Sequence, residues 1–173
     1  TKTVSITVNI TPTVNAVGSS SAICSGATAT LTGTGASTYN WLPGGSTSSA
    51  ITVNPSTTTI YTLTGSGSTG CVNTKTLSLT INAIPTVSAT SSAASVCSGS
   101  AATLTGSGAS SYTWNPGSLT GTSVVVNPTL TTLYTVLGLS AAGCSDTQTI
   151  SITANSIPVL TLTATSNTVC LNN

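Results

Sequence analysis

The chain has 173 residues, of which two are Lys, one is Asp and none is Arg, Glu or His, so that charged residues make up 2% of it. An ordinary globular domain has about 25% charged residues. General acid–base catalysis needs His or a tuned carboxylate, and Asp146 is the only carboxylate side chain. We therefore predict that the chain is not an enzyme and holds no metal or cofactor. Lys2 and Lys75 are too few cations to bind nucleic acid through its phosphates.

A 73-residue internal repeat organises the chain. Residues 12–84 align with 85–157 without a gap and share 37 identical positions. Residues 1–10 resemble 74–83, and residues 157–170 resemble 84–97. We predict two complete repeats, at 12–84 and 85–157. Residues 1–11 are then the last strand of a preceding repeat and 158–173 the first strand of a following one, so we expect the sequence to be a window from a longer array.

Alternating apolar residues and turn signals predict the strands of the first repeat. The predicted strands are 13–17, 28–33, 38–42, 50–54, 60–64 and 76–82. The second repeat has the same pattern 73 positions later. Thr, Val, Ile, Leu and Tyr dominate these stretches and favour strands over helices. Short alternating strands separated by turns indicate an all-β protein of tandem β-sandwiches, with about seven strands in each repeat.

The inward-facing positions of the predicted strands form the predicted core of each sandwich. They are Leu31, Trp41, Val53, Tyr61 and Leu63 in the first repeat, and Leu104, Trp114, Val126, Tyr134 and Val136 in the second. An alternative role for the two Trp residues is stacking on carbohydrate, but the core Trp of a sandwich is the favoured reading. The hydroxyls of Tyr61 and Tyr134 are expected to bond to nearby backbone.

Six short motifs follow one another in the same order in both repeats. In the first repeat they are Cys24-Ser25-Gly26, Leu31-Thr32-Gly33, Tyr39-Asn40-Trp41-Leu42-Pro43-Gly44, Val53-Asn54-Pro55, Thr58-Thr59-Ile60-Tyr61-Thr62 and Gly70-Cys71. This order resembles the immunoglobulin-like and PKD-like repeats of giant bacterial surface proteins, especially adhesin-type and type IX-secreted proteins of Bacteroidetes. The resemblance covers the whole chain and implies tandem Ig-like domains of an extracellular stalk or adhesin. It implies no catalytic residues, and such repeats usually carry more Asp, Glu and Lys.

Five cysteines without any His argue against zinc and suit an oxidising, extracellular setting. Bonds within each repeat would join Cys24 to Cys71 and Cys97 to Cys144. In an Ig-like sandwich, however, the segment before the second strand lies at the exit end and the loop before the last strand at the entry end. Because a disulfide needs Cα atoms within about 7 Å, the cross-repeat bond between Cys24 and Cys144 is favoured. Cys71, Cys97 and Cys170 would then pair outside this sequence.

Three further features have ordinary readings that we favour. Asp146 is one carboxylate where Ca²⁺ needs six to eight oxygens, and it replaces Asn73 of the first repeat, so a turn role is expected. Asn9-Ile10-Thr11 matches an N-glycosylation pattern. Because the motifs resemble bacterial proteins, we expect no glycan at this Asn. Pairs such as Thr28 and Thr30 are typical of ice-binding faces, but a 73-residue period gives no closely repeated array.

We predict a structural extracellular stalk or filament segment of a large repetitive cell-surface or adhesin protein, stabilised mechanically by disulfides. Two alternatives remain open: spacer repeats of a large secreted enzyme, and a self-assembling extracellular fibre whose uncharged faces pack laterally. The expected partners are neighbouring repeats of the same chain, with lateral self-association and glycans as further candidates. No nucleic acid is expected, and no apolar run approaches the roughly 18 residues of a membrane span.

Overall fold

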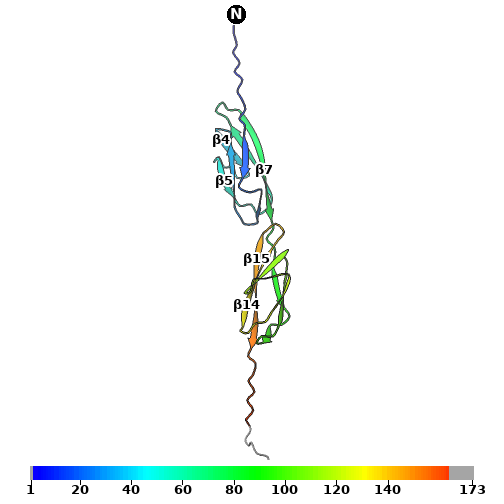
Figure 1. Ribbon diagram of the computed structural model, residues 1–173. Helices are drawn as coiled ribbons and strands as arrows, with labels where there is room; N and C mark the ends of the chain where they lie inside the picture. Colours follow the sequence, from blue (N-terminus) through cyan, green and yellow to red (C-terminus); the bar gives the residue numbers. More distant parts are fainter. Residues whose placement is uncertain (1, 164–173) are drawn as a thin grey trace, which may run out of the picture. The chain divides into compact units, whose positions relative to one another are not determined.

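The computed structural model describes residues 2–163, which contain strands and loops but no helix (Figure 1). The all-β prediction is confirmed. The chain divides into two compact units: unit 1 comprises Thr1–Pro85 together with Ala141–Cys144, and unit 2 comprises Thr86–Ser140 together with Ser145–Asn173. Each unit is an Ig-like β-sandwich of two sheets.

The described part of unit 1 has seven strands. They are β1 (Asn15–Gly18), β2 (Ala22–Cys24), β3 (Ala29–Thr34), β4 (Thr38–Leu42), β5 (Ala50–Val53), β6 (Thr59–Ser66) and β7 (Val72–Asn82). One sheet has the order β1-β3-β5 and the other β2-β7-β6-β4. All pairs are antiparallel except β2 with β7, which run parallel. The long β6–β7 hairpin is the centre of the second sheet.

Unit 2 repeats this topology over its described residues. Its strands are β8 (Ser88–Ser91), β9 (Ser95–Cys97), β10 (Ala102–Ser107), β11 (Ser111–Asn115), β12 (Leu119–Thr120), β13 (Ser123–Val126), β14 (Thr132–Leu139) and β15 (Ser145–Asn155). The sheets have the orders β13-β10-β8 and β12-β11-β14-β15-β9. The parallel pair is again a three-residue strand, β9, with the long last strand, β15.

The core of unit 1 lies between its two sheets. Strands β3 and β6 alternate buried and more exposed residues, as strands with one face against a core do. Leu31, Trp41, Leu63 and Leu79 are fully buried, Tyr61 is buried, and Val53 is partly buried against them. The Trp41 ring also has a polar partner, because its Nε1–H donates to the Ser48 carbonyl oxygen at 3.1 Å.

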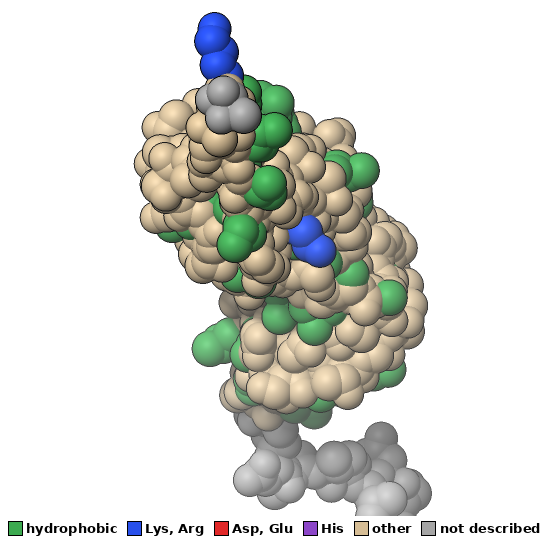
Figure 2. All heavy atoms as spheres, turned by 90° about the horizontal axis from the view of Figure 1, so that it is seen from above, with side chains coloured by type: hydrophobic (Ala, Val, Ile, Leu, Met, Phe, Trp, Pro, Cys, Tyr) green, Lys and Arg blue, Asp and Glu red, His purple; other side chains and the backbone are tan. Residues whose placement is uncertain are grey.

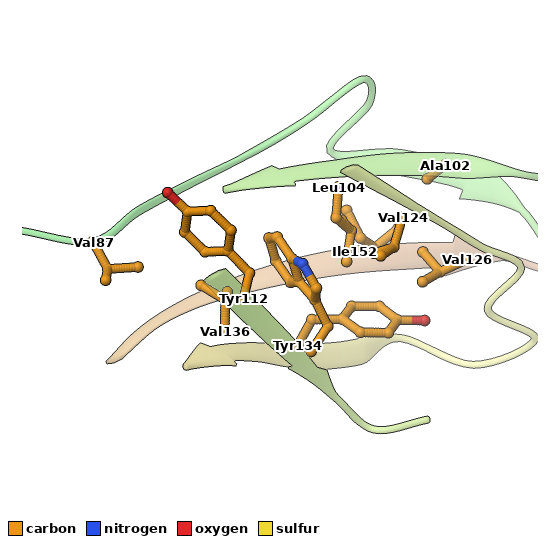
Figure 3. Close-up of a cluster of buried hydrophobic side chains, with 10 residues drawn as sticks. Val87, Ala102, Leu104, Tyr112, Val124, Val126, Tyr134, Val136 and Ile152 are labelled. Atoms are coloured by element: carbon orange, nitrogen blue, oxygen red, sulfur yellow. The ribbon is translucent and has the colours of Figure 1, made fainter. Parts of the chain in front are cut away.

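The core of unit 2 has the same plan (Figure 3). Its buried residues are Val87, Ala102, Leu104, Tyr112, Trp114, Val124, Val126, Tyr134, Val136 and Ile152. Leu104 of β10 points toward Ile152 of β15, so the two sheets meet through these side chains. Trp114 Nε1–H donates to the Gly121 carbonyl oxygen at 3.1 Å, which satisfies the one polar atom of this buried ring.

Gly35 follows β3 in a turn that needs glycine for two separate reasons. Its φ is +86°, in the left-handed region that side chains disfavour. A Cβ at this position would also collide with the Thr13 carbonyl oxygen. Gly26, with a similar φ of +80°, has open space where its Cβ would be. Both glycines have a backbone conformation that disfavours side chains, but only Gly35 also lacks the space for a Cβ.

The predicted strands coincide with observed ones to within a few residues, but three short strands are additional: β2, β9 and β12. Residues 2–10 lie in no strand and are exposed, and residues 158–163 are likewise without strand structure. The remainder of the predicted strand region 158–173, including Cys170, lies outside the described residues. The predicted repeat boundaries remain a prediction.

Candidate functional site

Unit 1 contains a disulfide between Cys24 and Cys144, residues separated by 120 positions in the chain. The S–S distance is 2.03 Å and the Cα atoms are 5.7 Å apart, which is the usual separation for a disulfide. Cys144 is buried, with 1% of its surface exposed, and Cys24 is partly buried. This bond is the one covalent cross-link among the described residues, and we treat it as the candidate functional site.

The parallel pairing of β2 with β7 positions Cys24. In this register Cys24 lies opposite Asn82, the last residue of β7. The next residue fixes the chain further, because the Ser25 N–H donates to the Asn82 carbonyl oxygen at 2.9 Å. Cys24 is therefore held at the end of β7 by backbone hydrogen bonds.

Cys144 reaches the same place from the segment Ala141–Cys144, which belongs to unit 1. Its Sγ lies 3.9 Å from the Asn82 carbonyl oxygen. Gly143, immediately before it, has a φ of +80°, a conformation that glycine adopts without steric cost. Asn82 thus has both bonded cysteines beside it.

The geometry of β7 explains why Cys24 is not bonded to Cys71 of the same repeat. Cys71 immediately precedes Val72, where β7 begins, whereas Cys24 lies opposite Asn82, where β7 ends. Ten residue steps at about 3.3 Å each place these two points roughly 33 Å apart. This distance excludes a disulfide between Cys24 and Cys71.

Two other described cysteines, Cys71 and Cys97, are free. Cys97 is exposed and lies opposite Asn155, the last residue of β15, as Cys24 lies opposite Asn82. Cys71 is partly buried, and its Sγ lies 3.8 Å from the Asn9 carbonyl oxygen. Each free cysteine therefore occupies the repeat position of a bonded one.

Sequence reasoning missed a pair of side chains that anchor the start of each last strand. Asn73 in β7 donates from Nδ2 to the Pro12 carbonyl oxygen at 2.9 Å. Asp146, at the equivalent position in β15, accepts from the Val87 N–H at 3.0 Å. Asp146 was expected in a turn but lies in a strand. The signal in the sequence was an Asn/Asp exchange between repeats, and the two side chains make opposite bonds: the Asn73 amide donates to a backbone carbonyl, whereas the Asp146 carboxylate accepts from a backbone N–H.

The hydroxyl-to-backbone bonds expected at Tyr61 and Tyr134 occur at another pair of tyrosines. The Tyr39 hydroxyl donates to the Ala36 carbonyl oxygen at 3.0 Å and accepts from the Ala36 N–H at 3.2 Å. Tyr112 makes the same two contacts with Ala109, at 2.9 and 2.7 Å. At Tyr61, burial raises the pKa of the hydroxyl above its usual value of 10.0, because a phenolate loses its hydration in the core.

Among the described residues there is no enclosed pocket and no cluster of metal-ligating side chains. His, Cys, Asp and Glu side chains do not gather in threes anywhere within residues 2–163. Over the same range no helix is long and apolar enough to cross a membrane. Trp41 and Trp114 are fully buried, so neither presents a platform for carbohydrate. The face in Figure 2 shows mostly backbone and uncharged polar side chains with scattered hydrophobic ones.

The fold and the covalent bond define a protein of Ig-like β-sandwich units with a disulfide between distant parts of the chain. No family model matches the sequence, and no curated protein matches it.

Several solved structures resemble the fold. A Ca²⁺-stabilized adhesin that helps an Antarctic bacterium bind ice is 19% identical, with 87% of this chain and 49% of that chain covered and a TM-score of 0.49. Murine CEACAM1b is 11% identical, with 83% and 100% covered and a TM-score of 0.42. A 1.5-MDa bacterial ice-binding adhesin is 16% identical, with 86% and 66% covered and a TM-score of 0.42. The chain spans about half the length of the first, and these likenesses concern the fold alone.

Proposed function

We propose that the chain is a structural segment of an extracellular stalk or filament, part of a large repetitive surface protein like the Bacteroidetes adhesins that its motifs resemble. The observation that carries this proposal is the disulfide between Cys24 and Cys144, 120 positions apart. A small domain gains stability from closing so long a segment, by about 5 kcal/mol in the loop-entropy account. Disulfides persist in oxidising compartments, which supports an extracellular location.

The composition supports a mechanical role over a catalytic one. The chain has no His and a single carboxylate side chain, so it lacks the groups that move protons in most enzymes. Each of the two repeats has a core built around one buried Trp. Each repeat also has one cysteine near either end of its last strand. Spacer repeats of a secreted enzyme would share these features and differ only in what they connect.

A second candidate, lateral assembly into fibres, is favoured by the surface. Ser78, Thr80, Ser151 and Thr153 are exposed on the last strands and carry short uncharged side chains. With charged residues at 2% of the chain, little electrostatic repulsion opposes the approach of another chain. Such contacts would depend only weakly on ionic strength, since so few charges are there to be screened.

Electron microscopy of native cells labelled with an antibody against this chain tests the proposal. Label on thin extracellular extensions supports a stalk, and label along bundles supports the fibre. Label on a released enzyme that forms no extension favours the spacer role. Label inside the cell, with all cysteines reduced, would overturn the proposal.

A further inference from the structure

Residues 2–10 have the sequence of a last strand but lie in no sheet. Thr-Lys-Thr-Val-Ser-Ile-Thr-Val-Asn at 1–9 matches Thr-Lys-Thr-Leu-Ser-Leu-Thr-Ile-Asn at 74–82, within β7. In β7 the side chain of Leu79 is fully buried, and Leu77 and Ile81 pack against the core. The equivalent side chains are Val4, Ile6 and Val8, which are 86%, 84% and 87% exposed. Three side chains that the repeat elsewhere places against a core thus have none here.

A second observation, on Cys71, concerns the same segment. The Sγ of Cys71 lies 3.8 Å from the carbonyl oxygen of Asn9. The Sγ of Cys144 lies 3.9 Å from the carbonyl oxygen of Asn82, and both of these residues are 73 positions further along the chain. Cys144 is bonded to Cys24. The free Cys71 therefore lies beside Asn9 as the bonded Cys144 lies beside Asn82.

We propose that residues 2–10 and Cys71 together bind an Ig-like sandwich of this same repeat type that precedes them in the array, with residues 2–10 as its last strand. Residues 2–10 complete the partner's sheet, and Cys71 forms a disulfide with the partner's cysteine at the position of Cys24. This inference rests on the proposed stalk function, for which it names the partner.

The pairing within unit 1 specifies how the partner would dock. β7 runs antiparallel to β6 and parallel to β2. Residues 2–10 therefore pair antiparallel with a β6-type strand of the partner and parallel with its β2-type strand. Since Cys24 lies opposite Asn82, the partner's cysteine lies opposite Asn9, next to the Cys71 sulfur. Val4, Ile6 and Val8 then enter the partner's core.

Bond formation follows thiol–disulfide exchange with a small disulfide oxidant, such as oxidised glutathione. The Cys71 thiolate attacks the oxidant, forms a mixed disulfide and releases one glutathione thiolate. The partner's thiolate then attacks the Cys71 sulfur and releases the second. Two protein thiols are oxidised to one disulfide, and one oxidant disulfide is reduced to two thiols, so electrons and protons balance.

The test adds one repeat to the full chain. A copy of residues 85–146 is fused directly before Thr1, so that residues 1–11 continue it with the 73-residue spacing intact. The fused protein is oxidised with a glutathione buffer, its free thiols are alkylated without reduction, and its peptides are mapped by mass spectrometry. Amide hydrogen exchange is measured over residues 2–10. The unextended chain provides the reference for both measurements.

We expect Cys71 to be alkylated in the unextended chain, and in the fusion to be unlabelled and linked to the added copy of Cys97. Amides of residues 2–10 should exchange slowly only in the fusion. The matched control replaces the added copy's Cys97 with Ser, which should restore alkylation of Cys71 and leave the slow exchange. A second fusion guards against the first added segment failing to fold. Its added repeat is a copy of residues 12–73 in which the copy's own Cys71 is replaced by Ser, while Cys71 of the original chain is kept.

Alkylated Cys71 in both fusions, or fast exchange of residues 2–10 in both, would overturn the inference. The stalk proposal fails on different grounds. Native extracellular extensions that contain Cys71 as a free thiol would remove this inference alone. If Cys71 is disulfide-bonded but the chain is found as part of a released enzyme, only the stalk proposal fails.

Discussion

Replacing Cys24 with Ser should change the path that force takes through the chain. With the disulfide intact, tension applied at the two ends passes along the backbone to Cys24, crosses the bond to Cys144 and continues from there. The residues between 24 and 144 are bypassed by the load. These include strands β3–β14, so most of both cores is shielded from tension. Cys24→Ser removes the bypass and loads every strand.

The magnitude follows from the length of the closed segment. A fully extended chain spans about 3.3–3.6 Å per residue. The 120 residue steps between the cysteines therefore correspond to roughly 400–430 Å of extension that the bond withholds. With the bond present, only the residues before Cys24 and after Cys144 can lengthen. The difference is large compared with the Cα–Cα distance of 5.7 Å across the bond itself.

Single-molecule optical tweezers measure this directly, with handles at the two ends of the chain. We expect the Cys24→Ser chain, and the unsubstituted chain under reductant, to reach a contour length about 400 Å greater than the oxidised chain. Cys97→Ser is the matched control, since Cys97 occupies the equivalent repeat position but is free. It should behave like the unsubstituted chain. Equal contour lengths for the oxidised chain and Cys24→Ser would refute the load-bypass argument.

Three further predictions concern the sandwiches themselves. Gly35→Ala should cost about 1–3 kcal/mol more than Gly26→Ala in urea unfolding, because only at Gly35 does the new Cβ meet the Thr13 carbonyl; equal costs would show that φ alone decides. Trp114→Ala should destabilise unit 2 by about 3–5 kcal/mol, since the ring is fully buried, and a loss below about 1 kcal/mol in the same assay would contradict its core role. The raised pKa of Tyr61 means that the unfolded chain loses this proton first, so the free energy of unfolding should fall as the pH rises from about 10 through the folded-state value. Tyr61→Phe should reduce that fall, and an unchanged pH profile would remove Tyr61 as its cause.

The sequence alone determined the strand content and most of the core. Alternating apolar residues between Gly, Pro and Asn turns need no tertiary information to indicate strands, because side chains of a strand point alternately to two faces. The 73-residue repeat supports these assignments, because each position of 12–84 can be compared with its equivalent in 85–157. Leu31, Trp41 and Leu63 lie in the core, as do Leu104 and Trp114 of the second repeat.

The tertiary structure decided which cysteines meet. Both the within-repeat and the cross-repeat pairing agree with the spacing of Cys24, Cys71 and Cys144. The choice depends on where β7 ends, and that end lies beside Cys24 only because the three-residue strand β2 pairs parallel with it. So short a strand has no alternation to recognise, and its stability comes from hydrogen bonds to a partner some 58 positions away in the chain.

Residues 1–9 and 74–82 give the sharpest contrast between the two kinds of information. Their patterns are nearly the same, yet Leu79 is fully buried and the equivalent Ile6 is 84% exposed. Alternation specifies which face of a strand would enter a core. Burial itself comes from the sheet that packs on that face, and β6 and β2 supply it for β7. The local sequence thus sets the face, and the neighbouring strands decide whether water leaves it, because the hydrophobic free energy depends on the apolar area actually covered.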